Sequence, residues 1–408
     1  MYAPLARVSL AHYTAIAAIG TYFLTLIFGR PWFHRSRELA SMALLTAIFI
    51  AGVPFAFWRA RSFEVLTEDW LKTAVIFFLL TQTSTTIPRI RKLVWTIILC
   101  MFVVSIFNIL NPNKSLTFQG RLMGATVGFL SGNYLGVAAG SMLPFIVMFL
   151  MKTRSVIARL ILLVTVPLLF WQVILSASRS SFMQMALAMI LIWLLLLRRM
   201  KGGNLVAGFT GVAVVIFLAL APGVFWNRLQ TLWMGGETEV NWQTQSAKFS
   251  EEQRERLFWR SIEFTLEDPL LGVGVGNFSI KSGNVTRKAT EWLGTHNTYT
   301  QISSEAGIPA LLLYVSLIIG AARGMLRISG ETSKRPEFED FCLFSRAILV
   351  GILVFAFAGF FAHLAYDYYF YYVVGMAACL KGAYQRATQL GETKARPHKP
   401  GLQPRMAG

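Results

Sequence analysis

Long apolar stretches separated by shorter polar segments dominate this chain and predict a bundle of membrane-spanning helices. Eleven such stretches can be read, near residues 10–29, 39–57, 70–87, 93–110, 125–151, 160–176, 181–197, 205–222, 307–324, 343–362 and 366–380. A hydrocarbon core about 30 Å thick needs roughly 20 apolar residues per helical crossing. The stretches are continuous and lack the alternation of a β-barrel, so helices are the expected spanning form. The predicted fold class is therefore all-α, a polytopic membrane bundle of about eleven helices with one long loop.

The basic residues are placed unevenly, and their placement predicts the orientation of the bundle. Lys and Arg gather in alternate polar segments: Arg30, Arg35 and Arg37; Arg89, Arg91 and Lys92; Lys152, Arg154 and Arg159; Arg198, Arg199 and Lys201; Arg323, Arg327, Lys334 and Arg335; and the tail from Lys381. Cytoplasmic loops of membrane proteins carry this excess of Lys and Arg. We therefore expect the N-terminus and the long loop of residues 223–306 to face away from the cytoplasm, and the C-terminal tail to lie inside.

Composition agrees with this class and limits the partners. Of 408 residues, 55% are hydrophobic and 14% are charged, whereas soluble domains carry about 25% charged residues. The net charge of +18 would suit nucleic acid, but its alternation between loops is explained by topology and contact with anionic membrane lipids. No nucleic-acid partner is expected.

The chain is predicted to form a single membrane domain over residues 1–390, into which the loop of about 223–306 is inserted. Residues 391–408 are rich in Lys, Arg, Pro and Gly and predict a disordered cytoplasmic tail. No internal repeat is visible. The three cysteines, Cys100, Cys342 and Cys379, lie outside the long loop, so we expect neither a disulfide framework nor a thiolate metal site there.

The second half of the long loop predicts an amphipathic helix that starts at about Ser250, as an N-cap followed by acidic residues. At 100° per residue, its polar arc contains Arg256, Arg260, Glu263 and Glu267, and its apolar arc contains Leu257, Phe258, Ile262, Phe264 and Leu266. Arg254 falls near the middle of the apolar arc. An arginine directed at a packed surface needs a compensating anion, whereas Arg256 and Arg260 have acidic neighbours within helical reach.

Two glycine- or serine-rich segments flank this helix in the sequence. Arg179 lies in SASRSS (176–181), between two apolar stretches, and is either a structural arginine at the interface or an anion clamp surrounded by small serines. GVGVGN (272–277) does not predict a dinucleotide site, because it lacks the GxGxxG spacing and a βαβ context. We interpret it as a flexible outward turn that allows a substrate or backbone to come close.

His296 is the only histidine of the long loop, followed by Asn297, Tyr299 and Gln301. A lone histidine is often structural, but a neutral imidazole beside arginines has the properties of a general base. No second histidine or carboxylate lies at metal-ligand spacing, so no metal is expected. We expect the other histidines, His12, His34, His363 and His398, to have no comparable surroundings.

SASRSS, then R-x-x-x-F-W and DPLLGVGVGNF, then HNTYTQISSEAGIP occur in this order over about residues 120–320. This order resembles the O-antigen ligase and polysaccharide polymerase superfamily. The resemblance implies a glycosyltransferase of the bacterial inner membrane that uses a polyprenyl-diphosphate-linked glycan as donor, with its active site on the periplasmic side and no cofactor. The implied acceptor is lipid A-core or a glycan.

By motif position, the resemblance assigns the catalytic base to His296 and diphosphate binding to Arg179 and Arg254. The helical-face argument selects Arg254 independently. Phe258 and Trp259 are adjacent, which makes the usual arginine-to-tryptophan spacing ambiguous and keeps Arg256 as the reserve candidate; Arg121 is a further diphosphate-binding candidate.

Several functions stay open at this stage. Within the superfamily the acceptor can be lipopolysaccharide core, a repeat unit or a protein side chain, the last being the protein O-oligosaccharyltransferase reaction. Outside it, a transporter or flippase for anionic lipid-linked substrates is possible, but it predicts charged residues within the spans and paired broken helices, which are not evident. A non-catalytic anchoring protein would tolerate the loss of His296.

Overall fold

The computed structural model describes residues 10–29, 34–110, 132–198, 242–287 and 292–395, together with scattered residues between 203 and 226. Every regular element in this part of the chain is a helix, which confirms the predicted all-α class. The α-helices are α1 (Leu10–Phe28), α2 (Arg37–Gly52), α3 (Arg59–Val65), α4 (Leu71–Thr83), α5 (Ile87–Leu110), α7 (Gly132–Lys152), α8 (Val156–Leu175), α9 (Arg179–Ile192), α12 (Trp242–Glu267), α13 (Phe278–Thr286), α14 (Thr298–Thr332), α15 (Glu339–Ala358) and α16 (Tyr368–Ala395). Short 3-10 or π segments extend or join them at Val53–Phe55, Leu66–Trp70, Trp193–Leu197 and Pro336–Phe338.

Seven predicted stretches coincide with helices long and apolar enough to cross a membrane. These are Arg37–Phe55, Ile87–Leu110, Tyr134–Lys152, Val156–Leu175, Arg179–Leu197, Thr298–Thr332 and Pro336–Ala358. The stretches near 10–29, 70–87 and 366–380 are also helical, in α1, α4 and α16. The stretch at 205–222 lies almost wholly outside the described residues, and so does most of the predicted tail, although α16 continues to Ala395, past the expected tail start at 391.

The centre of the bundle is formed by α7 and α15, whose apolar stretches are 78% buried, against 28% for α2 and α5. Glycines on α7 let its neighbours approach closely. A Cβ on Gly136 would lie 2.5 Å from Cα of Ser181 on α9, and one on Gly140 would lie 2.9 Å from a methyl of Val354 on α15. Small residues at such crossings are the usual basis of helix association in membranes, because lipid supplies no hydrophobic driving force between helices.

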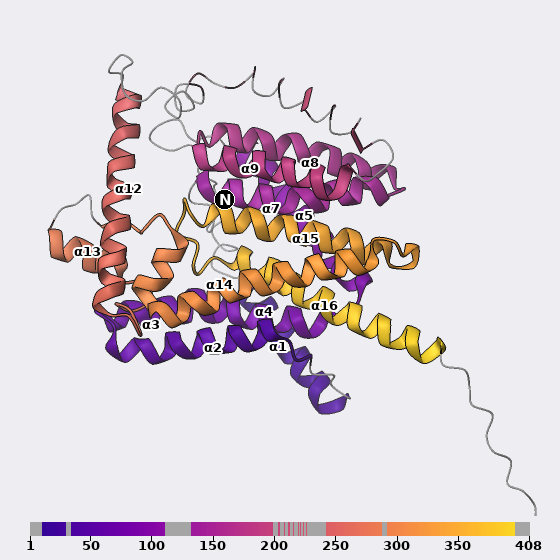
Figure 1. Cartoon of the computed structure of the whole chain (residues 1–408), viewed down its shortest axis with the longest axis horizontal. Coiled ribbons are helices and arrows are strands. Elements are labelled where there is room, and N and C mark those ends of the chain that lie inside the picture. Colours follow the sequence, from indigo (N-terminus) through magenta and orange to yellow (C-terminus); the bar gives the residue numbers. More distant parts are fainter. Residues whose placement is uncertain are drawn as a thin grey trace, which may run out of the picture.

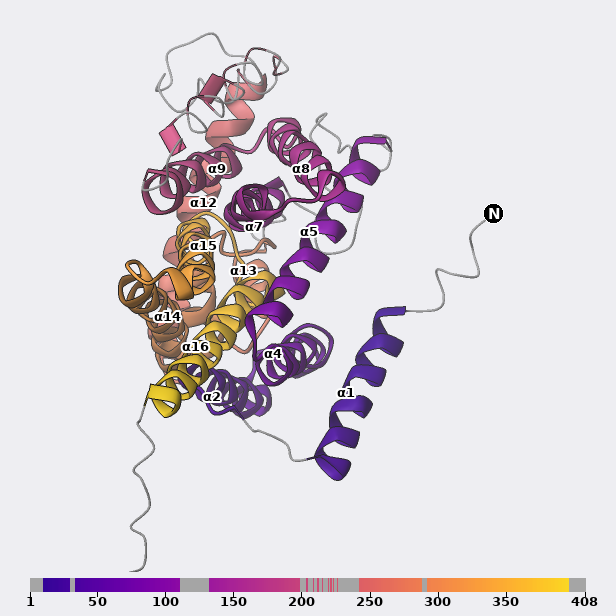
Figure 2. The same cartoon turned by 90° about the vertical axis from the view of Figure 1, so that its right-hand side faces the viewer.

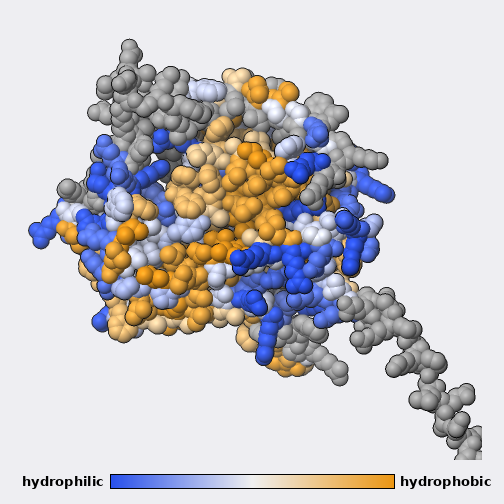
Figure 3. Space-filling view, in the orientation of Figure 1, coloured by the Kyte–Doolittle hydropathy of each residue, from blue (hydrophilic) through white to orange (hydrophobic). Residues whose placement is uncertain are grey.

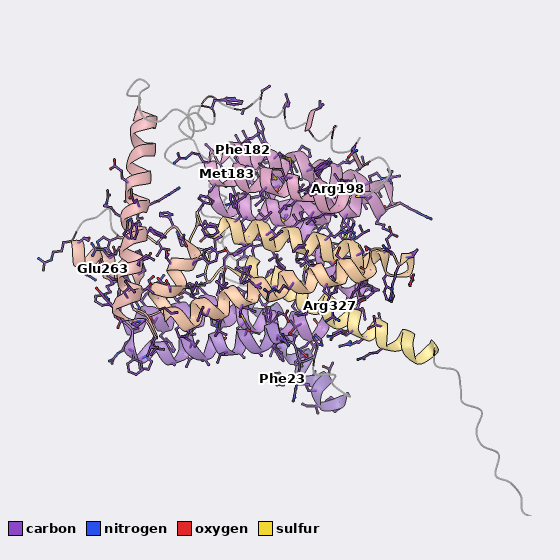
Figure 4. The ribbon with its side chains drawn as sticks, viewed as in Figure 1. Phe23, Phe182, Met183, Arg198, Glu263 and Arg327 are labelled. Carbon is purple, nitrogen blue, oxygen red and sulfur yellow. The ribbon has the colours of Figure 1, made fainter. Side chains whose placement is uncertain are left out.

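The two ends of the bundle differ in character. α12 runs across one end, roughly perpendicular to α2, α14 and α15 (Figure 1). The short helix α13 lies at the same end. The labelled Arg198 and Arg327 lie toward the opposite end (Figure 4). A hydrophobic belt lies between these two hydrophilic ends on the face shown in Figure 3. α1 is set apart at the edge, beside α4 (Figure 2), where the rings of Tyr22 and Phe78 lie 5.4 Å apart.

Candidate functional site

Helix α12 carries Arg254 on its packed face. It begins at Trp242, so the expectation of a start at Ser250 is wrong: the polar residues before Ser250 continue the helix instead of capping it. Leu257, Ser261 and Phe264 are 0%, 0% and 1% exposed, and Arg254 lies one turn before them on the same face. Its Nε atom is buried.

The opposite face of α12 carries its charged residues, as predicted. Arg256 is exposed, and Arg260 forms an ion pair with Glu263 at 2.9 Å. Leu266, which was expected on the packed arc, is 71% exposed, and Trp259 is 62% exposed, because helical periodicity places both outside the buried face. The helical-face argument is therefore right for Arg254 and Arg256.

The GVGVGN turn that follows α12 is buried, so its interpretation as a flexible outward turn is wrong. Gly272, Gly274 and Gly276 all have positive φ, at 65°, 95° and 75°, a conformation that glycine adopts at low cost. A Cβ on Gly272 would lie 2.5–2.6 Å from the backbone of residues 304–306. Close backbone approach was correctly expected, but the partner is the first turns of α14.

Glu305 fixes this turn to α14. Its carboxylate is 4% exposed and accepts three hydrogen bonds, from the Gly276 N–H (3.0 Å), the Phe278 N–H (3.1 Å) and the Tyr366 hydroxyl (2.6 Å). The carboxylate thus joins three segments that are far apart in the sequence. Immediately after it, α14 is kinked at Gly307, with φ 83° and ψ 172°.

We expect Glu305→Ala to destabilise the protein by about 3–5 kcal/mol, since each buried donor left without its acceptor costs about 1–3 kcal/mol. Thermal unfolding of the purified protein in detergent measures this. The matched control is Glu263→Ala, which removes an exposed carboxylate paired with Arg260 and should cost less than about 1 kcal/mol. Equal melting temperatures for the two variants would contradict the role of Glu305.

The segment that carries His296 is bonded to the loop of residues 359–367, between α15 and α16. The Thr298 N–H donates to the Gly359 carbonyl at 2.7 Å. The Thr298 hydroxyl donates to the Ala362 carbonyl at 2.7 Å and accepts from the Leu364 N–H at 2.9 Å. These bonds hold the two segments side by side just outside the spanning helices.

His296 itself is in the left-handed conformation, with φ 53°, immediately before the cap of α14. The side chain of Asn297 accepts hydrogen bonds from the N–H groups of Tyr299 and Thr300. This cap starts the helix directly after His296. Such backbone strain in a non-glycine residue often marks a functional site.

The imidazole of His296 lies against that of His363, with ring centroids 5.2 Å apart and planes at 74°. Gly294 makes room for this pair, because a Cβ there would lie 3.0–3.2 Å from the His363 ring. Nδ1 of each histidine is buried and has no hydrogen-bond partner among the described residues. The expectation that His363 has no comparable surroundings is therefore wrong: its neighbour is far away in the sequence, and no local pattern in HLAYD indicates the contact.

The electrostatics of His296 place Arg254 close by. Burial, together with the smaller electrostatic effects of His363 and Arg254, lowers the pKa of His296 to about 3. Burial also lowers the pKa of His363. Both imidazoles are thus neutral near pH 7. The structure brings together the predicted base, one predicted cation and a second histidine that sequence reasoning missed.

Arg179 is the first residue of α9, half-buried among buried serines, with Ser178 as the N-cap. Its helix reaches the histidines through α7: Gly136 contacts Ser181, and the Tyr134 hydroxyl donates to the His363 carbonyl at 3.3 Å. Arg179 therefore lies at the same end of the bundle as His296. Arg121 lies outside the described residues.

The carboxylate of Asp367 accepts a hydrogen bond from the Tyr369 N–H at 2.8 Å, at the start of α16. In the described part of the chain, no group of three or more His, Cys, Asp or Glu is placed to hold a metal ion.

The fold and this site define a polytopic helical membrane protein with ionisable groups gathered at one end of the bundle. Residues 164–315 match the family described as O-antigen ligase, which confirms the resemblance to the O-antigen ligase and polysaccharide polymerase superfamily. The matched region contains Arg179, Arg254, Arg256 and His296. Among curated proteins, none matches this chain.

Proposed function

We propose that this protein is an inverting glycosyltransferase that moves a glycan from a polyprenyl-diphosphate donor to a hydroxyl acceptor at the periplasmic face. The match to the O-antigen ligase family supports the class of reaction. The single observation that carries the site is the electrostatic effect of Arg254, on α12, on the pKa of His296, in the segment before α14. Helix α12, which carries Arg254, runs across the end of the bundle away from Arg198 and Arg327 (Figures 1 and 4).

The chemical task is displacement at an anomeric carbon. The acceptor oxygen attacks this carbon, the bond from the carbon to the diphosphate oxygen breaks, and the lipid diphosphate departs with the electron pair. The acceptor proton passes to His296. A single displacement inverts the anomeric configuration, and a diphosphate leaves without needing a general acid.

Two guanidinium groups supply the charge that the leaving group requires. Arg254 and Arg179 are assigned this role because a planar, permanently charged guanidinium binds phosphate oxygens bidentately. A cation stabilises the negative charge of the leaving group most when it is already oriented and removed from water. The Nε atom of Arg254 is buried. Arg121 keeps its proposed helper role, and Arg256 becomes the less suitable candidate because it is exposed.

His363 is added to the proposal as a positioning residue. Its ring packs against His296 at 5.2 Å, and its loop is hydrogen-bonded to the first residue of α14. This contact limits the orientations that the His296 ring can adopt. A base held in one orientation loses less entropy when the acceptor binds.

The direct test uses purified protein with a labelled glycan on polyprenyl diphosphate and a lipid A-core or glycan acceptor. We expect transfer of the label, release of polyprenyl diphosphate, and inversion at the anomeric carbon as seen by NMR. A product with retained configuration would contradict the single displacement. In a deletion strain, loss of long chains from lipid A-core indicates a ligase, whereas chains that stay one unit long indicate a polymerase.

The pH dependence follows from the low pKa of His296. The imidazole becomes protonated, and useless as a base, only below its pKa of about 3 in the free enzyme. A bound diphosphate offsets the charge of Arg254 and raises this pKa. Since kcat/KM reports free-enzyme groups and kcat those of the complex, the acid limb of kcat should lie at higher pH than that of kcat/KM. Coincident limbs would contradict this coupling.

A further inference from the structure

A cavity of about 500 Å³ lies between α2, α14 and α16, away from the histidine pair. Its lining is strongly basic, with Arg35, Arg37, Arg323, Arg327 and Lys381 against one carboxylate, Glu38. Its residues belong to the basic end of the bundle, where Arg327 is labelled in Figure 4. Five cations around one cavity favour an anionic ligand.

The single carboxylate of the cavity is already engaged. Glu38 is 3% exposed, and its Oε1 accepts from the Lys381 ammonium at 2.6 Å. Arg327 is ion-paired on the other side with Glu331 at 2.7 Å, outside the lining. The charge of Arg35, Arg37 and Arg323 is therefore not offset by an acidic side chain within the cavity lining.

A buried histidine forms part of the cavity wall. His34 is 8% exposed, and its backbone exchanges two hydrogen bonds with the side chain of Gln82, at 2.8 and 3.1 Å. Its Nε2 is buried and has no hydrogen-bond partner among the described residues. Burial, and then the charge of Arg386, lower the pKa of His34, so the ring is neutral and the positive charge of the lining comes from its arginines and Lys381.

The cavity adjoins surface that suits acyl chains. Along α14, Ile319 and Leu326 are 41% and 56% exposed, and Gly320, which lines the cavity, has open space around the position of a Cβ. Figure 3 shows hydrophilic residues directly beside the hydrophobic belt in this region. A ligand here can place its anionic part among the arginines and its apolar part along α14.

We propose that this cavity binds the phosphate of an anionic phospholipid headgroup. Guanidinium groups match phosphate oxygens in geometry and charge, and basic pockets between membrane helices are suited to such headgroups. The site is separate from the proposed glycan-transfer site, because none of its lining residues belongs to α12 or to the loops that hold His296 and His363. Phospholipid binding at this cavity can therefore be tested independently of the proposed enzyme activity.

The test measures thermal stabilisation of the delipidated full chain in detergent. The probes are dioleoyl phosphatidylglycerol, dioleoyl phosphatidylcholine with the same acyl chains, and inorganic phosphate. We expect saturable stabilisation by phosphatidylglycerol that weakens with salt, and far weaker effects of the other two. Equal stabilisation by phosphatidylcholine would overturn the proposal, and equal stabilisation by inorganic phosphate would assign the cavity to a free anion instead of a lipid.

Two pairs of variants locate the binding. Gly320→Leu places a bulky side chain in the cavity and leaves all of its charges unchanged. It should weaken the apparent affinity for phosphatidylglycerol by about tenfold or more, the effect expected when shape complementarity is lost. Gly330→Leu, on the same helix and also in open space, is its control. The double variant Arg35→Gln/Arg323→Gln should weaken phosphatidylglycerol binding about thirtyfold. Its control, Arg154→Gln/Arg159→Gln, loses the same charge outside the cavity and should change the affinity by less than about threefold. Unchanged affinity in Gly320→Leu would overturn the assignment to this cavity.

Discussion

Replacing His296 with asparagine should lower kcat for glycan transfer by about 10²–10⁴-fold, the usual contribution of a positioned general base. The acceptor hydroxyl is a poor nucleophile until its proton is removed. The imidazole is neutral in the free enzyme and lies beside a cation that would hold the diphosphate. Donor binding should change little, since the base acts on the acceptor.

The choice of substitution matters because His296 has φ 53°. Asparagine and glycine adopt this conformation readily, whereas alanine adds backbone strain of about 1 kcal/mol. His296→Asn and His296→Gly therefore remove the imidazole without disturbing the cap of α14. Added imidazole should restore part of the activity of His296→Gly, which a structural role of the ring would not predict.

The measurements are single-turnover transfer of labelled glycan, donor binding, and the melting temperature of each variant. Turnover near that of the wild type in His296→Asn would remove the base assignment. His363→Phe keeps a planar ring against His296 but no nitrogen. It should retain more activity than His363→Ala if His363 acts by packing, and equal losses in the two variants would contradict the positioning role.

The second large effect separates two arginines that are two positions apart on α12. Arg254→Ala should lower kcat/KM by about 10²–10³-fold, as the loss of one preorganised charge-stabilising donor does. Arg256→Ala should change it by less than about threefold, because an exposed charge in water contributes little. The difference follows from the helix face: Arg254 shares the packed side with Leu257, and Arg256 points outward.

Arg254→Lys is expected to recover only part of the loss, since an ammonium cannot bind two phosphate oxygens in the bidentate geometry of a guanidinium. The pH dependence of kcat/KM in Arg254→Gln separates an electrostatic role of Arg254 from a purely structural one, which would leave this dependence unchanged. Because the charge of Arg254 lowers the pKa of His296, its removal should shift the acid limb of kcat/KM to higher pH. Equal losses in Arg254→Ala and Arg256→Ala would contradict the assignment.

Local patterns in the sequence were sufficient for several features of this protein. Hydropathy predicted the spanning helices, because a chain segment in lipid must satisfy its own backbone hydrogen bonds. Helical periodicity placed Arg254 on the packed face of α12, because side chains three and four residues apart share a face. Both are properties of residues that are near one another along the chain.

The same reasoning misjudged features that depend on contacts between distant segments. The GVGVGN turn looked flexible because glycine permits many conformations, yet its glycines are fixed against α14 by close backbone contact. His363 looked isolated in a short loop, yet its ring packs on His296. The helix start at Ser250 was misplaced because a good capping residue can also lie within a helix when the rest of the chain continues it.

The sequence by itself determined the membrane class, the basic end of the bundle and the inward direction of Arg254, since each depends on composition or periodicity within one segment. Only the tertiary structure decided that His363 adjoins His296, that Glu305 joins three segments, and that the arginines of α14 and of the segment around α2 enclose one cavity. These contacts arise from the way helices pack and turn on one another, and packing is fixed by the shapes of many side chains at once.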